Sequence, residues 1–371
     1  MPISSAIPSA AARSVTLGGQ VLPLVSPARI YLCGITPYDV THLGHAATFV
    51  WADAATSIMR MAGIEAIVCR NVTDIDDHLT RAAAEHDSAY DEFAVTQEYL
   101  FDRDMTALGV RRPTYSPRAR HFVDQVIQLA SALLESGHGY ERDGQVYFRG
   151  YPAIPGGTPA LDEEHGELTE GPDRAEPYDV AVWRASGPGD PAWPSPWGQG
   201  RPGWHAECAA IAMSVLGSTV DLVAGGADLA FPHHAYQAAL VEAASGARPF
   251  ARSRLSVGTV GIDGKKMAKS TGNLVLVSEL LKEHSPAAIR LLLLDRDWRE
   301  AWDYTPGDLH TAAGRLERLY SAGGRRGGPA GAAEAARGAM LRELDVPTAL
   351  DIAEEAGGEA ARLVLHTLAL A

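Results

Sequence analysis

The lysines of this chain are concentrated in one short segment. Among 32 lysine and arginine residues only four are lysines, and three of them lie in the run Lys265-Lys266-Met267-Ala268-Lys269-Ser270, which Gly264 precedes. Compact, mobile ammonium groups on a glycine-flanked loop suit a triphosphate whose geometry changes during reaction. This run therefore indicates a phosphate-binding loop.

A histidine pair, His42-Leu43-Gly44-His45, lies between a predicted strand over residues 29–32 and a helical pattern from Leu43 to Met61. Imidazoles and backbone N–H groups at a helix N-terminus form a favourable anion site. Each motif also has a plainer interpretation, since the histidines could be a helix cap and a surface residue, and the lysines a solvated turn. The histidine motif follows the first strand and the lysine motif follows the last strand of a doubly wound fold. This order favours a protein that binds ATP and cleaves it between the α and β phosphates.

Three residues that are far apart in the sequence have the side chains of a zinc site. Cys33 ends the first predicted strand, Cys208 lies in a helical run, and His233 and His234 follow Phe231-Pro232. Two thiolates and an imidazole would leave the fourth tetrahedral position of Zn²⁺ open for substrate. Their spacing matches no local metal signature, so three unrelated residues stay an alternative. Cys69, within a predicted strand, is expected to be a small core residue.

Composition excludes several classes of protein. The chain has 371 residues, 46% of them hydrophobic and 21% charged, as in ordinary globular proteins. Its apolar runs are too short to span a membrane, no secretory leader is expected, and three cysteines do not make a disulfide scaffold. A net charge of −14 lacks the basic surface that nucleic acids require. We expect a cytoplasmic, monomeric enzyme with small-molecule substrates, no nucleic-acid partner and no membrane partner.

The order of predicted elements indicates a doubly wound parallel α/β sheet of the Rossmann type. Residues 28–75 read as strand, helix and strand, which implies a parallel βαβ unit. Helical periodicity follows over 91–108 and 121–134, and Asp143-Gly144 marks a hairpin over 140–148. Residues 151–203, rich in Pro, Gly and Asp, are expected to be irregular. Strands and helices alternate again from 204 to about 295, and the pattern is helical from 305 onward.

These patterns predict the following division of the chain. Residues 1–27 form a flexible N-terminal segment, 28–112 and 204–304 a catalytic nucleotide-binding domain, 113–203 an insertion, and 305–371 a helical C-terminal domain.

Several ordered blocks resemble the class I cysteinyl-tRNA synthetase superfamily over about residues 28–310. The blocks are Cys33-Gly34-Ile35-Thr36-Pro37-Tyr38-Asp39, His42-Leu43-Gly44-His45, Asn71-Val72-Thr73-Asp74-Ile75-Asp76-Asp77, Gly203-Trp204-His205-Ala206-Glu207-Cys208, Gly225-Gly226-Ala227-Asp228-Leu229-Ala230-Phe231-Pro232-His233-His234 and Lys266-Met267-Ala268-Lys269-Ser270. Within the superfamily, Ile35, Pro37, His45 and the short helical tail are most similar to the cysteine ligases of mycothiol biosynthesis. The resemblance implies a class I aminoacyl-tRNA-synthetase-like fold.

The resemblance also implies a reaction. ATP, with Mg²⁺, and cysteine give cysteinyl-adenylate and pyrophosphate, and the amine of glucosaminyl-inositol then displaces AMP to form an amide. Cys33, Cys208 and His233 would hold one Zn²⁺ per chain, which would bind the cysteine thiolate. His42 and His45 would stabilise charge on the phosphates, and Lys266 and Lys269 would hold the pyrophosphate. Further residues implied to line the pocket are Cys33, Gly34, Ile35, Thr36, Thr48, Asn71, Val72 and Thr73 for cysteinyl-adenylate, Trp204 for cysteine, Gly226, Ala227 and Asp228 for the ribose, and Val260 for the adenine.

Three departures from the family pattern matter. Gln237 and Ala235 stand where the tRNA enzymes usually have acids near the metal, which favours three protein ligands. Ala268 replaces the usual serine of the lysine loop. Residues 170–174 differ from the segment that the mycothiol ligases carry there, which leaves the acceptor open. The alternatives are a ligase for another small amine, a truncated cysteinyl-tRNA synthetase and a non-catalytic paralogue.

Overall fold

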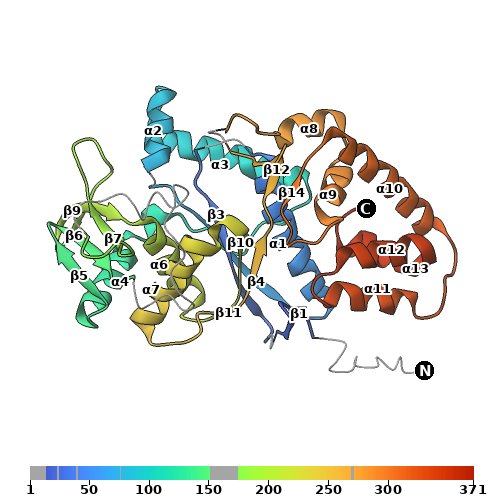
Figure 1. Cartoon of the computed structure of the whole chain (residues 1–371), viewed down its shortest axis with the longest axis horizontal. Helices are drawn as coiled ribbons and strands as arrows, with labels where there is room; N and C mark the ends of the chain where they lie inside the picture. Colours follow the sequence, from blue (N-terminus) through green and yellow to red (C-terminus); the bar gives the residue numbers. More distant parts are fainter. Residues whose placement is uncertain (1–13, 23–24, 39–40, 76, 151–173, 269–270) are drawn as a thin grey trace.

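The computed structural model describes residues 14–22, 25–38, 41–75, 77–150, 174–268 and 271–371. Figure 1 shows a parallel sheet at the centre of the molecule, an antiparallel sheet at one end and a group of helices at the other. None of the helices in these ranges combines the length and the apolar character needed to cross a bilayer.

The central sheet confirms the predicted doubly wound topology. Its strands β3 (Ala28–Ile35), β4 (Ala66–Val72), β10 (Val220–Gly226) and β11 (Ala251–Val257) are all parallel, in the order β11-β10-β3-β4. Helix α1 (Leu43–Met61) connects β3 to β4, as the βαβ pattern predicted. The chain leaves β3 toward β4 on one side, whereas β10 pairs with β3 on the other. The chain that leaves β3 runs to β4, and the chain that leaves β10 runs to β11 in the opposite direction along the sheet. A topological switch point therefore lies between the carboxyl ends of β3 and β10, where such folds bind ligands.

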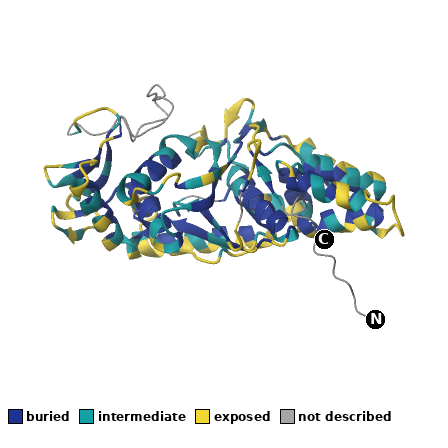
Figure 2. Cartoon of the chain, turned by 90° about the horizontal axis from the view of Figure 1, so that it is seen from below, coloured by how far each residue is buried: buried dark blue, intermediate teal, exposed yellow. Residues whose placement is uncertain are grey.

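Side-chain alternation along β3 divides the interior into two cores. Ile30 and Leu32 pack with α1 on one face, whereas Tyr31 and Cys33 pack with helix α6 (Trp204–Leu216) on the other. A strand turns successive side chains to opposite faces, so Cys33 must point toward α6. Figure 2 shows the buried residues gathered in the central sheet and on the inward faces of its helices.

The antiparallel sheet corrects one expectation. Its strands β5 (Gly139–Arg142) and β6 (Gln145–Phe148) form the predicted hairpin, and β7 (Val180–Ala185), β8 (Trp193–Ser195) and β9 (Gly198–Pro202) complete the order β5-β6-β7-β9-β8. Residues 180–202 are therefore largely strand and not irregular. The proline content wrongly suggested irregular structure here, because Pro194 lies in the edge strand β8, where a missing backbone N–H is tolerated. Residues 151–173 lie outside the described part.

Helix α4 (Val123–Glu135) packs against this sheet, α6 packs against both this sheet and one face of the parallel sheet, and α7 (Ala235–Ser245) packs against α4 and α6. Helices α2 (Asp77–Glu85) and α3 (Tyr90–Ala107) form a separate pair with a small core of their own. The short helical segments Ala119–His121, Ala227–Leu229 and Ala230–His234 complete this part of the chain.

The helical end of the molecule follows a small sheet. Strands β12 (Val260–Ile262), β13 (Lys265–Lys266) and β14 (Trp302–Asp303) form that sheet, and helices α8 (Val277–Glu283) and α9 (Pro286–Leu294) lie between β13 and β14 in the sequence. From residue 306 every element is a helix, as predicted: α10 (Pro306–Gly324), α11 (Ala332–Leu341), α12 (Val346–Ala356) and α13 (Gly358–Thr367).

Part of the segment expected to be flexible lies in a hairpin of β1 (Thr16–Leu17) and β2 (Gln20–Val21). Val15 and Leu17 are buried in the core, and Glu343 accepts hydrogen bonds from the backbone N–H groups of Gly18 and Gly19. The buried apolar pair and these long-range bonds attach the hairpin to the C-terminal helices. The domain division itself stays a prediction.

Candidate active site and metal centre

A pocket of about 360 Å³ opens at the switch point. The carboxyl ends of β3 and β10, the first turns of α1 and the β12–β13 hairpin surround it. Fourteen of the residues expected at the site line it: Cys33, Gly34, Ile35, Thr36, His42, His45, Thr48, Asn71, Thr73, Trp204, Gly226, Asp228, Val260 and Lys266. Val72 is buried in β4 beside it, and Ala227 begins the turn after β10. Lys269 lies outside the described residues.

The pocket also contains residues to which the sequence assigned no role in the site. Tyr38, Phe49, Phe101, Leu229 and Met267 contribute apolar surface to its walls. Phe101 comes from α3 and packs edge-on against Phe49 of α1 at 4.8 Å between ring centroids. The helical periodicity of α3 could have suggested that Phe101 is buried, but not that it faces this pocket.

Gly34 and Asn71 bring the ends of β3 and β4 together. The Gly34 N–H donates to Asn71 Oδ1 at 2.9 Å, and a Cβ at Gly34 would lie 1.6 Å from the Asn71 carbonyl oxygen. Only glycine allows this approach. Thr36 and Thr73 continue the contact, with their hydroxyls 2.7 Å apart. Backbone and hydroxyl groups thus line one wall of the pocket.

His42 caps helix α1, as the alternative interpretation of this histidine as a helix cap predicted. Its Nδ1 accepts from the Gly44 N–H at 3.1 Å, and the His42 and His45 rings lie 3.8 Å apart. Burial, with His45 and Lys266 nearby, lowers the pKa of His42 to about 3, so the ring is neutral. Because Nδ1 accepts, the proton of the neutral ring is on Nε2, which makes Nε2 a donor suited to a phosphate oxygen.

The lysine segment is a hairpin strand rather than a simple loop. Asp263 and Gly264 have positive φ and form the turn between β12 and β13, and the pairing places Lys265 opposite Ile262. Lys266 lines the pocket and Lys265 does not, as alternation along a strand requires. Asn273, which the motifs did not single out, accepts from the Ala268 N–H and donates to the carbonyls of Lys265 and Lys266.

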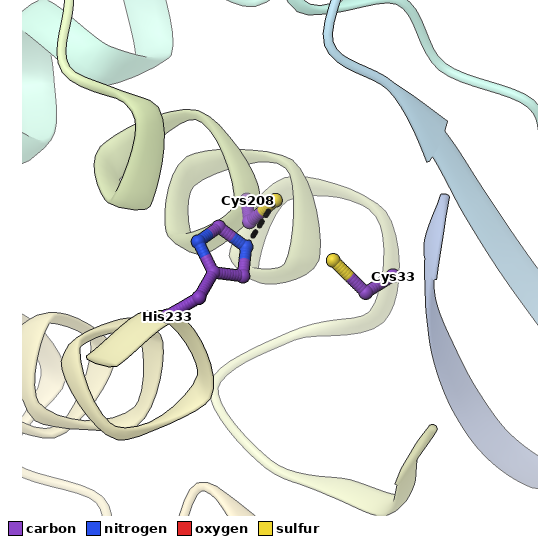
Figure 3. Close-up of side chains that lie close together, drawn as sticks. All are labelled: Cys33, Cys208 and His233. Atoms are coloured by element: carbon purple, nitrogen blue, oxygen red, sulfur yellow. Dashed lines mark hydrogen bonds between the residues drawn. The ribbon is translucent and has the colours of Figure 1, made fainter. Parts of the chain in front are cut away.

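Cys33, Cys208 and His233 come together beside the pocket, whose lining includes Cys33. Their candidate ligand atoms all lie within 4.8 Å of one another, and all three residues are buried. Figure 3 shows Cys33 facing the other two side chains from the opposite side, with His233 Nε2 at 3.2 Å from Cys208 Sγ. The Asn71 amide also donates to Cys208 Sγ, at 3.4 Å.

The donor set fits a divalent metal of the zinc type. Burial and the neighbouring Cys33 raise the pKa of Cys208, and burial lowers the pKa of His233. A neutral imidazole is the form that binds a metal, and a bound cation would favour the thiolate that burial opposes. Cys69 stands apart from this group on β4, where burial raises its pKa to about 12.

Other polar residues surround the three candidate ligands. Gln237 donates to the Cys208 carbonyl at 3.3 Å, and Trp204 stacks on the His233 ring at 4.1 Å between centroids. His234 is buried, but it is not one of the three residues whose ligand atoms converge. Trp204 therefore lies between the candidate metal centre and the open part of the pocket.

Gly226 ends β10, and Asp228 lies in the turn that follows it. A Cβ at Gly226 would lie 2.3 Å from Asp228 Oδ1, so glycine lets this carboxylate approach the backbone. Asp228 Oδ2 accepts from Lys266 Nζ at 2.6 Å. The pocket thus contains two helix-terminal histidines, a carboxylate and an ammonium group, and Cys33 in its lining connects it to the candidate metal centre.

Comparisons with known proteins match most of the length of this chain. Residues 24–314 match the family described as tRNA synthetases class I (C) catalytic domain. The chain is 43% identical over 353 residues to the L-cysteine:1D-myo-inositol 2-amino-2-deoxy-alpha-D-glucopyranoside ligase of Streptosporangium roseum, covering 91% of this chain and 86% of that protein. It is 41% identical over 366 residues to the ligase of the same name from Acidothermus cellulolyticus, covering 95% and 89%.

Solved structures share the fold at low sequence identity. Methionyl-tRNA synthetase of Mycobacterium tuberculosis, bound by methionyl-adenylate, superposes with a TM-score of 0.64 at 16% identity, covering 93% of this chain and 89% of that one. A putative arginyl-tRNA synthetase from Campylobacter jejuni gives 0.58 at 13% identity, covering 93% and 91%.

Proposed function

This chain belongs to the class I (C) tRNA-synthetase catalytic-domain family and to its branch of cysteine ligases, and on that premise we propose that it is an ATP-dependent ligase that joins L-cysteine to the amine of glucosaminyl-inositol in mycothiol biosynthesis. The observation that supports the proposal is the convergence of Cys33, Cys208 and His233, of which Cys33 also lines the pocket that contains His42, His45 and Lys266.

The first half of the reaction would activate cysteine. Its carboxylate oxygen attacks the α phosphorus of ATP, the bond from that phosphorus to the bridging oxygen breaks, and pyrophosphate leaves. The Nε2–H of His42 and the start of α1 would donate to phosphate oxygens, and Lys266 would neutralise charge on the leaving pyrophosphate, roles that the position of His42 and Lys266 in the pocket lining supports. We propose the same role for Lys269 from the sequence motif, and for His45 beside His42.

Cys33, Cys208 and His233 would hold one Zn²⁺, which when bound supplies a soft Lewis acid for the substrate thiolate. These side chains orient cysteine so that its carboxylate faces the phosphates, with Trp204 covering the amino-acid side. A hydrophobic pocket alone rejects an isosteric hydroxyl analogue weakly. Thiolate binding therefore accounts for selection of cysteine over serine.

The second half of the reaction would form the amide. The neutral amine of the acceptor attacks the acyl carbon of cysteinyl-adenylate, AMP leaves and the amine loses a proton. Asp228, Gly226 and Ala227 are suited to the ribose and Val260 to the adenine of that intermediate. The acceptor must enter from the open side of the pocket. From the sequence we propose the insertion from Asp173 to Trp197 and the neighbourhood of His78 as acceptor contacts, although none of residues 174–197 is among those that line the pocket. Asp173 and the side chain of His78 lie outside the described residues.

Product analysis tests the proposal directly. The purified protein is incubated with ATP, cysteine and glucosaminyl-inositol, and the products are identified by mass spectrometry. The expected products are the cysteinyl amide and AMP, with pyrophosphate. ATP–pyrophosphate exchange that depends on cysteine, combined with charging of tRNA or with transfer only to a different amine, would overturn the acceptor and leave cysteine activation standing.

A further inference from the structure

A second histidine is bonded to the candidate metal ligand His233. His205 lies in the first turn of α6, three residues before Cys208, so both side chains project from neighbouring positions on the same helix. His205 Nδ1 lies 2.9 Å from His233 Nδ1. Both rings are buried, with exposed fractions of 3% for His205 and 0% for His233. Two ring nitrogens therefore share a hydrogen bond away from bulk water.

The two nitrogens of His233 face different partners. Nε2 faces Cys208 Sγ at 3.2 Å, inside the cluster of candidate ligand atoms, whereas Nδ1 faces His205. A neutral imidazole carries one proton, and the nitrogen that binds a metal must be the bare one. Coordination through Nε2 therefore requires a proton on Nδ1, and that proton needs an acceptor. The only partner at hydrogen-bond distance that the described residues give to Nδ1 is His205 Nδ1.

The His205 ring is held in place by its own packing. It stacks on Tyr236 of α7 at 5.3 Å between centroids, with the ring planes 10° apart. The Tyr236 hydroxyl donates to the Tyr178 carbonyl at 2.6 Å, which connects this stack to the antiparallel sheet. Tyr236, whose packing sets the direction of the acceptor nitrogen, is not among the residues that line the pocket.

We propose that His205 is a positioning residue that accepts the Nδ1–H of His233 and so keeps His233 in the tautomer and orientation in which Nε2 binds the metal. His205 itself belongs to neither the group of candidate ligand atoms nor the pocket lining. The inference rests on the proposed function in one respect, that a metal is held by Cys33, Cys208 and His233. Ligand imidazoles ordinarily donate their second N–H to a fixed acceptor, and here a second imidazole takes that place.

Two substitutions separate the hydrogen bond from the packing. His205→Asn keeps an oxygen acceptor close to the position of Nδ1, whereas His205→Leu removes the acceptor and keeps a side chain of moderate size. His86→Leu, at an exposed histidine outside the site, controls for the loss of a histidine as such. Zinc-loaded proteins are titrated with a chromophoric chelator to measure zinc affinity, and circular dichroism establishes that each variant is folded.

We expect His205→Leu to bind zinc about 10- to 100-fold more weakly, as for other residues that orient metal ligands. His205→Asn should recover most of that loss, and His86→Leu should bind as the wild type does. Wild-type affinity in His205→Leu, or an Asn variant as weak as the Leu variant, overturns the inference. A wild-type protein without zinc would instead contradict the proposed metal centre itself.

A second measurement needs no folded variant at position 205. In the zinc-loaded wild-type protein, ¹⁵N NMR of the imidazoles distinguishes a protonated ring nitrogen from a bare or metal-bound one. The His233 signals are identified by their loss in His233→Asn. We expect a protonated Nδ1 on His233, and a bare or metal-bound Nδ1 there overturns the inference.

Discussion

Lys266 and Asp228 face each other within the pocket, with Nζ 2.6 Å from Oδ2, although 38 positions separate them in the sequence. Their side chains are 52% and 40% exposed, so the ion pair contributes at most about 1 kcal/mol. A triphosphate carries several charges and can therefore take Lys266 from this partner. The pair brings Lys266, which we propose binds the pyrophosphate, into direct contact with Asp228, which we propose binds the ribose.

Lys266 should matter for catalysis far more than its neighbour Lys265. Lys266→Met should lower cysteine-dependent ATP–pyrophosphate exchange by about 10²- to 10³-fold, because it removes a charge aimed at the leaving group. Lys265→Met is the matched control, since Lys265 lies outside the pocket lining. Equal losses in the two variants would show that strand β13 acts through its overall charge.

The metal content should depend on Cys208 and not on Cys69. Protein purified without added zinc should contain about one equivalent, as one site of this kind holds. Cys208→Ala should lose the metal, whereas Cys69→Ala, also buried but outside the cluster, should keep it. Elemental analysis measures both, and full metal in Cys208→Ala would disprove the ligand assignment.

Serine should be a very poor substrate. If the thiolate binds the metal, serine should support pyrophosphate exchange at least ~10³-fold less well than cysteine. A site that makes a specific polar contact with its substrate discriminates between analogues more strongly than a hydrophobic pocket does. The comparison uses kcat/KM for exchange with each amino acid. Comparable values would mean that the metal does not contact the substrate side chain.

His42 should make stability depend on pH below neutrality. Its pKa is lowered from the usual 6.5 to about 3, first by burial, so between these values the unfolded chain binds a proton that the folded protein does not. The contribution of His42 to stability is therefore full above about pH 6.5 and is lost as the pH falls, by about 1.4 kcal/mol per unit.

His42→Asn isolates this effect, because asparagine also caps helices but does not titrate. Urea unfolding of both proteins between about pH 6.5 and pH 5 should give a slope for the free energy of unfolding that is about 1.4 kcal/mol per unit smaller in the variant. Parallel slopes would contradict a buried, neutral His42.

Arg290 should be critical for the connection between α1 and the C-terminal helices. It pairs with Asp53 of α1 and donates to the carbonyls of Leu368 and Leu108, and it is 1% exposed. Arg290→Met removes the donor to both carbonyls and one ion-pair partner of Asp53, which keeps Arg111, and this should cost about 3–5 kcal/mol in urea unfolding. Lys282→Met, which breaks the exposed pair with Glu279, should cost less than about 1 kcal/mol. A similar cost for both would contradict this role of Arg290.

The local sequence was sufficient to predict many of the helices, strands and turns of this protein. The predicted helix from Leu43 to Met61 has the same bounds as α1, and the predicted strands on either side of it pair in parallel. The hairpin around Asp143-Gly144 is also as predicted. These features depend on periodicity, turn chemistry and short crossovers, which are written in contiguous residues. The strands within 180–202 were missed because proline and glycine content does not reveal an edge strand.

The assembly of the candidate site was decided by tertiary structure. The sequence supplied the residue types of Cys33, Cys208 and His233, but their spacing left open whether they meet. They meet because β3 turns Cys33 to the face that α6 covers, and because β10 pairs beside β3 and delivers His233 to the same end. The His205–His233 bond depends on the packing of α6 against the turn before α7, and no local pattern encodes it. Side-chain type is a local property, whereas the direction and distance between side chains follow from strand order and helix packing.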